Sequence, residues 1–593
     1  MITQPYTIVI ILTFTMALFI WGRWRYDVVA LMALTSAVAC RAVPFHSVYD
    51  GLSNPAVITV ACVMILSSIV NQSPLIQIPL RGISQLTQHR TLYILSLTAF
   101  TAFLSSFMNN IGALAIMMPI AVQSARSANI SPSTVLMPIA LGSALGGLNT
   151  MIGTPPNLLI SNFKEQATGH AFGMFSFGKV GLAITMIGVL YVGLVGWRLI
   201  PKNRKQAHNT DSLFEITDYI TEARVTDNSP LVGKVINRKQ LKEWGDFSII
   251  GVVRDDQKRM SLNHEIVIEI GDILIMEADA ATLNHLIDSL KLEWIQDRAI
   301  STDILKTDDI SLIEAVITES SRIEGRQLNE LNLRSRFHAN IIAISRQGRF
   351  LKTRLASLVC RAGDVLLIQG SETDLQQMIY RLKLLPLEQR KLTFIANKKI
   401  NLGILFFILA IIMTTTQLLP IQIAFGGAVF LCMVFHVIPV RHYYENINWP
   451  VIILLAAMIP LGEALQTTGG TTLITHTILH STQPSSPIIT IALLMIVTMT
   501  LSDFINNAAT TIVMAPIAIS LAQSLHYHSD PFLMAVAISA SCSFLTPVGH
   551  QNNTIIMGPG GYRFSDYIRV GFFLQLLILL ISVPMILWVW PVN

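Results

Sequence analysis

Long apolar runs, separated by short polar segments, fill residues 1–200 and 399–593 of this chain. A helix needs roughly 20 mostly apolar residues to cross the hydrocarbon core of a bilayer, so these runs predict membrane-crossing helices. The predicted spans are Tyr6–Trp21, Val28–Val43, Ala56–Val70, Thr134–Ile160, Val180–Ile200, Leu402–Leu419, Ile421–Val440, Val451–Leu465, Phe532–Met557 and Val570–Trp590.

Two further apolar segments carry adjacent asparagines in their middle, and one is nearly a copy of the other. The first contains Asn109-Asn110 and the second Asn506-Asn507. The apolar arms of the first pair are near or below the length of a straight span, so residues 92–123 are predicted as a re-entrant hairpin, and residues 488–525 likewise. An unsatisfied polar group at membrane depth costs roughly several kcal/mol. We therefore expect a ligand at each hairpin tip.

The helix that follows each hairpin is interrupted at matching positions. Thr150–Asn157 (TMIGTPPN) aligns without a gap with Thr546–Asn553 (TPVGHQNN). Paired Gly- and Pro-interrupted segments in two halves point to the binding site of a secondary transporter. The predicted fold is a polytopic α-helical membrane protein, an inverted repeat of five helices plus one re-entrant hairpin per half. Helices one, two, seven and eight lack such breaks and are the scaffold candidates.

Composition and charge fit a membrane protein with one soluble insert. Mean hydropathy is +0.56 and 13% of residues are charged, against about 25% in soluble domains. The charges gather between Lys202 and Lys399, and the net charge of +5 lies mainly on loops, which implies no nucleic-acid partner. Five cysteines without CxxC spacing suggest neither disulfides nor a zinc site.

Basic residues orient the predicted helices. Placing the N-terminus outside leaves little beyond Arg41 and Lys164 in the outer loops. The inner loops then hold the basic insert and Arg23, Arg25, Arg81, Arg90, Arg126, Arg441 and Arg563. The positive-inside rule therefore predicts a multi-pass cell-membrane protein with a cytoplasmic insert.

The insert contains a duplication of its own. Segments 231–234, 249–254 and 271–275 recur in register as 323–326, 341–346 and 363–367. Short apolar runs bounded by Gly-Asp turns predict strands, and Ala281–Leu290 and Thr373–Leu382 predict one amphipathic helix per copy. Arg254 and Arg346 are equally explained as solvated charges at strand ends. The predicted domains are residues 1–200, 206–297, 298–390 and 399–593.

Each copy in the insert resembles the TrkA-C (RCK-C) module of potassium-transport regulators, through its repeated Gly-Asp-[Ile/Val]-Leu core. The resemblance implies two small α/β domains that regulate transport by binding a cytosolic small molecule. No residue marks out that ligand. Paired modules also suggest a homodimer, and holding a dimer together is the alternative role.

The membrane halves resemble the divalent anion:sodium symporter family over essentially all of the chain outside the insert. In that family each tip carries Ser-Asn-Thr, and the tips and breaks form two sodium sites flanking one anion. Here Asn109-Asn110-Ile111 and Asn506-Asn507-Ala508 stand at those positions, so the central asparagine is kept and the flanking hydroxyls are absent. The motifs Gly153–Asn157 and Gly558–Phe564 (GPGGYRF) are similar to members with TrkA-C inserts, some of them linked to sulfate uptake.

The resemblance implies two overlapping sets of ligand contacts. Substrate contacts would be Asn109, Asn110, Asn506, Asn507, Thr154 and Thr546. Sodium contacts would be Asn109, Asn110, Ile111, Thr150, Gly153, Asn506, Asn507, Ala508, Thr546 and Gly549.

The chemistry of these residues suits such a site. A carboxamide offers an acceptor and two donors, so asparagines can meet an anion through N–H groups and a hard cation through oxygens. Helix N-termini after each tip would add positive dipole ends. Neither tip nor either break contains Lys or Arg, so co-transported cations must neutralise the anion, which is a physical reason for coupling.

The sequence predicts a sodium-coupled symporter of a divalent oxyanion, not an enzyme, with no cofactor or resident metal. Sulfate is the first expectation for the substrate and a di- or tricarboxylate the alternative. A TrkA-C-gated channel or antiporter and a membrane sensor are hypotheses of other classes. Asn pairs also serve as interhelical hydrogen bonds. Glu463, Asp503 and His550 lie at or near membrane depth, where each is either a proton or sodium ligand or a structural group.

Overall fold

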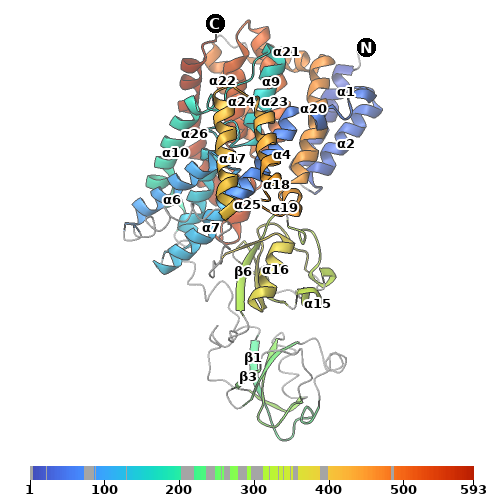
Figure 1. The fold of residues 1–593 in the computed structure, drawn as a ribbon, viewed down its shortest axis with the longest axis vertical. Coiled ribbons are helices and arrows are strands. Elements are labelled where there is room, and N and C mark those ends of the chain that lie inside the picture. The colour runs from blue at the N-terminus through green and yellow to red at the C-terminus, as the bar shows by residue number, and fades with distance from the viewer. Residues whose placement is uncertain are drawn as a thin grey trace. The chain divides into compact units, whose positions relative to one another are not determined.

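The structure is a computed structural model in which the chain forms two compact units (Figure 1). The helical unit comprises Met1–Ala207, Thr318–Ser320 and Leu387–Asn593, and the second unit comprises His208–Ile317 and Ser321–Pro386. The structure describes residues 4–21, 23–71, 86, 89–128, 130–201, 220–234, 248–254, 257–259, 267–277, 290–294, 311–319, 321–331, 333–337, 339–347, 349–351, 358–387, 398–482 and 486–592.

Helices account for nearly all of the described helical unit. In its first part they are α1 (Gln4–Trp21), α2 (Tyr26–Ala39), η1 (Phe45–Ser47), α3 (Asp50–Ser53), α4 (Pro55–Asn71), α6 (Arg90–Ser105), α7 (Asn110–Ser127), α8 (Ser133–Gly146), α9 (Pro155–Thr168), α10 (Gly178–Tyr191), the π-helix η4 (Val192–Gly196) and α11 (Trp197–Leu199). In its second part they are α17 (Lys398–Thr415), α18 (Ile421–Val434), α19 (Val440–Glu445), α20 (Trp449–Thr467), α21 (Gly470–Thr482), α22 (Pro487–Ser502), α23 (Asn507–Ser524), α24 (Ser529–Ala540), α25 (Gln551–Met557) and α26 (Phe564–Val589).

A helix occupies each predicted span, and both predicted interruptions are present. α8 ends before the break at residues 147–154, and α24 ends before the break at residues 541–550. Helix α21 was not predicted, because its threonines and histidines interrupt the apolar pattern. Its start after Gly469, which has a φ of 80°, separates it from α20.

Four helical stretches in the described residues are long and apolar enough to cross a bilayer: Phe45–Asn71, Gly178–Leu199, Trp449–Thr467 and Phe564–Val589. The other apolar helices are shorter, among them the two arms α6 and α22 and the interrupted pieces α8 and α24. Large apolar side chains are exposed on outer faces, for example Ile10, Met186 and Leu580. Such a surface suits lipid rather than water.

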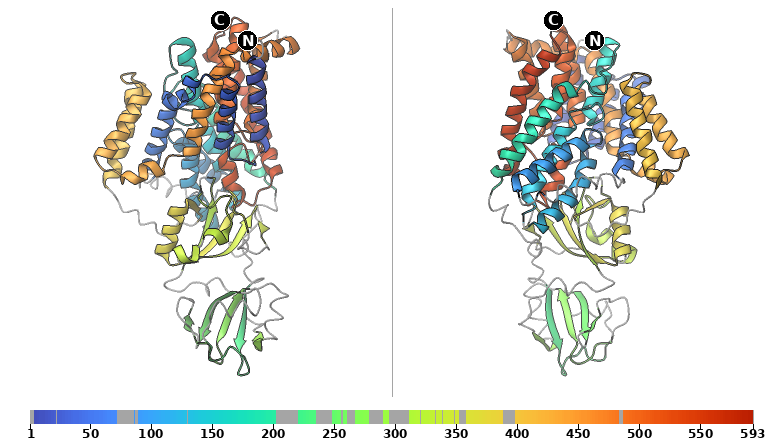
Figure 2. Two further views of the ribbon diagram at one scale, coloured as in Figure 1. Left: turned by 90° about the vertical axis from the view of Figure 1, so that its right-hand side faces the viewer. Right: turned by 60° about the vertical axis from the view of Figure 1, so that its left-hand side comes forward.

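The two parts of the helical unit interlock. α9 packs against both α23 and α24, and α10 packs against α26, beside which it lies in Figure 1. Lys164 on α9 pairs with Asp530 on α24 at 2.7 Å. The scaffold candidates lie in pairs, α1 against α2 and α17 against α18, and the second pair stands together at one side in Figure 2.

The GPGGYRF segment lies between α25 and α26 and contacts α8 through Tyr562. Tyr562 is fully buried, and its hydroxyl donates to Ser133 O and accepts from Met137 N–H at 2.9 Å. The hydroxyl therefore stands between the carbonyl and N–H that would otherwise bond within the first turn of α8. Tyr567 in turn donates to Asn553 O at 2.7 Å. The bonds of Tyr562 give the tyrosine of GPGGYRF a structural role, and they do not assign a ligand to the segment.

The second unit contains two five-stranded antiparallel sheets with the same strand order. The first is built from β1 (Ile220–Val225), β2 (Ser248–Arg254), β3 (Gln257–Arg259), β4 (Ile273–Glu277) and β5 (Leu292–Trp294), in the order β3-β2-β4-β1-β5. The second is built from β6 (Ser311–Ile317), β7 (Asn340–Arg346), β8 (Arg349–Phe350), β9 (Val365–Gly370) and β10 (Leu384–Pro386), in the order β10-β6-β9-β7-β8. Short helices η8 (Leu328–Leu331), α15 (Leu333–Phe337) and α16 (Glu372–Leu382) accompany the second sheet.

The repeated segments of this unit match the strands in part. β2, β4, β7 and β9 lie where strands were predicted, and α16 matches the predicted helix Thr373–Leu382. Residues 231–234 and 323–326 form turns instead, because Gly233 and Gly325 adopt φ values of 73° and 74°. The predicted helix Ala281–Leu290 falls outside the described residues except for its last residue.

The repeated arginines and Gly-Asp turns form buried ion pairs. Arg254 Nε lies 2.7 Å from Asp272 Oδ1, and Arg346 Nε lies 2.7 Å from Asp364 Oδ1. A second guanidinium nitrogen of each arginine bonds the other carboxylate oxygen. The two arginines end β2 and β7, as predicted, but they pair with aspartates whose side chains are at most 1% exposed, so these charges are not simply solvated. The hydrogen bond that Arg346 donates to Asp364 also raises the pKa of Arg346.

We expect Arg346→Gln to loosen the second sheet, because it leaves the Asp364 carboxylate buried without its cation. Losing one partner of a buried pair costs about 3–5 kcal/mol. Hydrogen exchange on the full-length protein should then accelerate in peptides covering β7 and β9. Arg361→Gln is the control, because this exposed residue contacts the Asp364 carboxylate through its backbone N–H, which the substitution keeps. Unchanged exchange in Arg346→Gln would show that the pair is not structural.

Candidate functional site

The first hairpin tip lies between α6 and α7, and its asparagines face different partners. Asn109 caps α7, since its Oδ1 accepts from Ile111 N–H at 3.4 Å. Asn110 is 4% exposed, and Ser105 Oγ lies 2.8 Å from its Oδ1. Ser143 on α8 donates to Asn110 O at 2.7 Å. Two serine hydroxyls thus contact Asn110, one at its side-chain oxygen and one at its backbone carbonyl.

The second tip, between α22 and α23, has the same plan. Asn506 caps α23 by accepting from Ala508 N–H at 3.0 Å. Ser502 donates to Asn507 Oδ1 at 3.0 Å, and Ser543 donates to the same oxygen at 3.2 Å. The sequence prediction missed Ser105 and Ser502, although each precedes the second asparagine of its tip by five residues.

Each break is bonded to the tip of its own half. Thr150 Oγ1 donates to Ser106 O, and Thr546 Oγ1 donates to Asp503 O. These contacts place the predicted residues Thr150 and Thr546 against the tips rather than in open space. Their hydroxyl protons are used in these bonds, and Thr546 Oγ1 also accepts from Gly549 N–H at 3.0 Å.

The last asparagine of each break holds its loop closed. Asn157 Nδ2 donates to Gly147 O at 3.2 Å and to Thr150 O at 2.8 Å. Asn553 Nδ2 donates to Ser543 O at 3.2 Å and to Thr546 O at 3.0 Å. The two asparagines are at most 3% exposed. Their role is to satisfy backbone carbonyls that the interrupted helices leave free.

The glycines of the breaks lie where backbones approach closely. A Cβ on Gly147 would lie 2.5 Å from Asn110 Oδ1 and 2.5 Å from Thr154 Cγ2. Gly153 packs directly against the backbone of Gly147. A Cβ on Gly549 would lie 2.5 Å from Ser502 O. No side chain fits at these points without moving a tip.

Contacts also join the tip of one half to the break of the other. Asn110 Nδ2 lies 3.1 Å from His550 Nε2, and Asn552 Nδ2 donates to Ser143 Oγ at 3.1 Å. Thr154 Oγ1 lies 3.3 Å from Ser541 Oγ. The sequence alone could not pair these residues, because they are hundreds of positions apart. Of the predicted contacts, Asn110 and Thr154 are therefore bonded to the second half, whereas the side chains of Asn109 and Asn506 cap their own helices.

Some buried polar side-chain atoms on the helices that carry the second tip and break have no hydrogen-bond partner. In the part of the chain that the structure describes, Thr510 Oγ1, Ser539 Oγ and Asn552 Oδ1 are buried without a hydrogen-bond partner. Each costs about 1–3 kcal/mol unless a ligand or water pairs with it. They lie on α23, α24 and α25, and the first half adds Asn71 Oδ1, which is also unpaired among the described residues and lies beside Gly112.

The acidic candidates differ in their surroundings. Asp503 is 1% exposed, and its carboxylate accepts from Leu545 N–H and Gln575 Nε2, both at 2.9 Å. These bonds tie α22 to the second break and to α26. Glu463 on α20 is half-buried. Within the described residues, no three His, Cys, Asp or Glu side chains gather as a metal centre would require.

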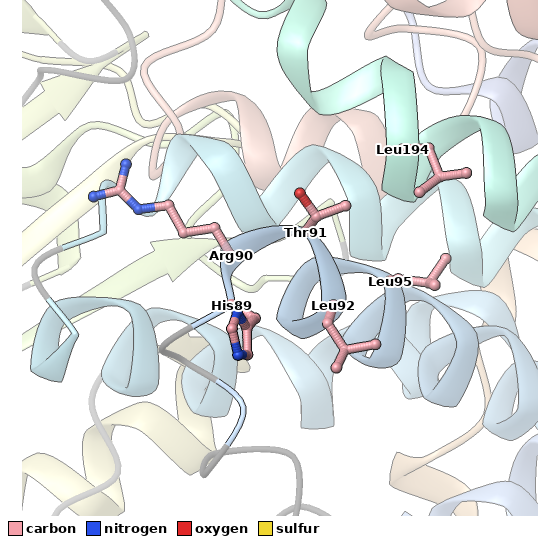
Figure 3. A pocket seen from close by; sticks show the side chains of 6 residues that line it. All are labelled: His89, Arg90, Thr91, Leu92, Leu95 and Leu194. Atoms are coloured by element: carbon pink, nitrogen blue, oxygen red, sulfur yellow. The ribbon is translucent and has the colours of Figure 1, made fainter.

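An open cavity of about 480 Å³ lies at the start of α6, away from the tips. Its lining residues are His89, Arg90, Thr91, Leu92, Leu95 and Leu194. Figure 3 shows that Arg90 and His89 extend in different directions rather than toward one point. None of the predicted contacts lines this cavity.

Comparison with known proteins points to transport. A family model described as "Citrate transporter" (CitMHS) matches residues 16–537. An uncharacterized transporter of Synechocystis is 29% identical, over 99% of this chain and 97% of its own length. A putative sulfur deprivation response regulator of Chlamydomonas reinhardtii is 25% identical over 94% and 97%. A probable sodium/sulfate cotransporter of the same alga is 25% identical over 45% of this chain and 31% of its own length.

We expect Gly147→Ala to destabilise the helical unit, because the new methyl group would press on Asn110 and Thr154. Overpacking of this kind costs about 1–3 kcal/mol. Thermal unfolding of the purified protein should shift to a lower temperature. Gly427→Ala on α18 is the matched control, since a Cβ there meets no atom within 4 Å. Equal unfolding temperatures for Gly147→Ala and the wild type would mean that the close approach is absent.

Proposed function

Because the chain belongs to the citrate transporter family, we propose that it is a secondary transporter that moves a divalent oxyanion together with sodium. The observation that carries this proposal is the pairing of tip and break in both halves. Thr150 bonds the first tip, Thr546 bonds the second, and the two assemblies meet through Asn110 and His550. Such a polar cluster, built twice within apolar helices, suits a transported ligand.

Coupling to sodium follows from the charge of the cluster. The tips and breaks contain no Lys or Arg, so an anion there needs another source of positive charge. The N-terminal ends of α7 and α23, which begin at the tips, supply partial positive charge. Carboxamide, hydroxyl and backbone oxygens are suitable ligands for a hard cation. Sodium would therefore enter as cargo that makes anion binding favourable.

We propose sulfate as the substrate before a carboxylate. Both tips lack flanking hydroxyls at Ile111 and Ala508, which mildly disfavours a long dicarboxylate. The printed name of the cotransporter from the alga supports sulfate as well. The description of the family as citrate transporters favours a tricarboxylate, which is the second candidate.

We also propose the architecture that the sequence predicted. The two parts of the helical unit would form an inverted repeat with opposed hairpins, in a cell membrane, with the second unit in the cytoplasm. Matching bonds at Ser105–Asn110 and Ser502–Asn507 support the repeat. The shared strand order of the two sheets supports two modules of the TrkA-C kind. Regulation by a cytosolic ligand and a homodimer are parts of this proposal.

Asn110→Ala and Asn507→Ala should each abolish sodium-dependent uptake of labelled sulfate into proteoliposomes. Each change removes a buried carboxamide from a tip, while the yield and elution profile of the purified protein should stay normal. Asn401→Ala, on an exposed position of α17, is the control and should transport like the wild type. Normal uptake by both tip variants would refute the proposed site.

Competition identifies the substrate class in the same assay. We expect unlabelled sulfate, thiosulfate or molybdate to suppress labelled sulfate uptake, and succinate or citrate to have little effect. Labelled citrate uptake that only carboxylates suppress would make the tricarboxylate the substrate instead.

Replacing residues 206–390 with a flexible linker tests the regulatory role of the second unit. Uptake should persist, since no predicted contact of the anion or sodium lies in that segment. It should no longer respond to cytosolic small molecules, whose effect depends on preferring one transport state. Complete loss of uptake in a well-folded protein would assign the segment to the transport machinery.

A further inference from the structure

His550 occupies a position at which the two halves differ. The gap-free alignment of the breaks sets His550 opposite Thr154. The imidazole is 8% exposed and caps α25. Its Nδ1 lies 3.1 Å from Asn552 N, and its Nε2 lies 3.1 Å from the carboxamide nitrogen of Asn110. It is therefore in direct contact with the first tip.

The partners of the ring determine where its proton is. The backbone N–H of Asn552 can only donate, so Nδ1 must accept and carries no proton. In a neutral imidazole the proton then resides on Nε2, which becomes a donor. A carboxamide NH₂ opposite Nε2 would place two donors against each other. The side-chain oxygen of Asn110 satisfies this contact, and its nitrogen does not.

Rotating the Asn110 carboxamide by half a turn resolves the conflict, because its oxygen and nitrogen have nearly the same shape. Its oxygen then accepts from His550 Nε2–H, and its NH₂ group faces Ser105 Oγ, 2.8 Å from the position that the oxygen leaves. The hydroxyl of Ser105 can accept that hydrogen bond. Every polar atom of the contact is then paired.

The second tip lacks this arrangement. Ser543 donates to Asn507 Oδ1 at 3.2 Å, which favours an oxygen on that side, and Ser502 Oγ, 3.0 Å from the same oxygen, also has Ala540 O as an acceptor at 2.6 Å. At the place of Ser543 the first half has Gly147, in the same gap-free alignment. The first tip therefore has Ser105 in the place of Ser502, but it has His550 rather than a second serine against its carboxamide.

We propose that His550 is a positioning residue that fixes the carboxamide of Asn110, with the oxygen bonded to Nε2–H, one N–H bonded to Ser105 and the second N–H available to a ligand. The first tip then offers a donor, which suits an oxyanion, and the Asn110 oxygen is directed at His550 Nε2. This inference rests on the proposed function, and it assigns Asn110 to the anion rather than to the cation.

Two substitutions of His550 test its two contacts separately, the one with Asn552 N–H and the one with Asn110. His550→Asn keeps an acceptor near Nδ1 for Asn552 N–H but has no group that reaches Asn110. His550→Gln carries an amide nitrogen that reaches about as far as Nε2 and can donate to Asn110. His170→Gln, in an exposed loop, is the control for losing a histidine.

Binding of sulfate and of sodium to the purified full-length proteins is measured by titration calorimetry, each at a concentration of the other ion that saturates both the wild type and the variant, so that the coupling between the ions does not transfer a loss of one affinity to the other. We expect His550→Asn to weaken sulfate binding about tenfold or more, since Asn110 loses its fixed orientation, and to leave sodium affinity within about twofold. His550→Gln should restore sulfate affinity to near the wild-type value. The control should bind both ions normally.

Three results would overturn the proposal. They are unchanged sulfate affinity in His550→Asn, an equal loss of sulfate and sodium affinity, and a failure of His550→Gln to restore sulfate binding when its unfolding temperature is normal. A wild-type protein that binds no sulfate or carboxylate, although it is folded, would refute the proposed function and this inference with it.

Discussion

The need to pair buried polar groups within an apolar helical unit governs the rest of this structure. Interrupting α8 and α24 frees backbone carbonyls that water cannot reach, and Asn157 and Asn553 satisfy them. Ending α6 and α22 at the tips frees further carbonyls, which Thr150 and Thr546 bond. An unpaired backbone group would cost roughly several kcal/mol. Interruptions of α8 and α24 are therefore tolerated only where other side chains or backbone groups pair with the freed carbonyls.

The same constraint explains the polar contacts between the two halves. Asn110, Ser143 and Thr154 of the first half find partners in the second half. Tyr562 reaches into the first turn of α8, and Lys164 pairs with Asp530. A polar cluster that is complete only between two halves changes when the halves move. That property is what a transporter needs at its ligand site.

Much of the helical unit and the tips could be predicted, because apolar length and an internal repeat are both visible in the sequence. Thr150 and Thr546 lie against the tips that their spacing suggested. The Asn110–His550 contact was not predictable, since no local pattern pairs residues 440 positions apart. In the insert, Arg254 and Arg346 were interpreted as solvated, because the sequence gives no sign that Asp272 and Asp364 become buried.

The central claim is that the tips and breaks form one site at which an oxyanion binds only together with sodium. Equilibrium binding of labelled sulfate to the purified protein, in sodium chloride and in potassium chloride of equal ionic strength, tests it most directly. The account predicts saturable binding in sodium and at least tenfold weaker binding in potassium. Equal affinity in the two salts would contradict it.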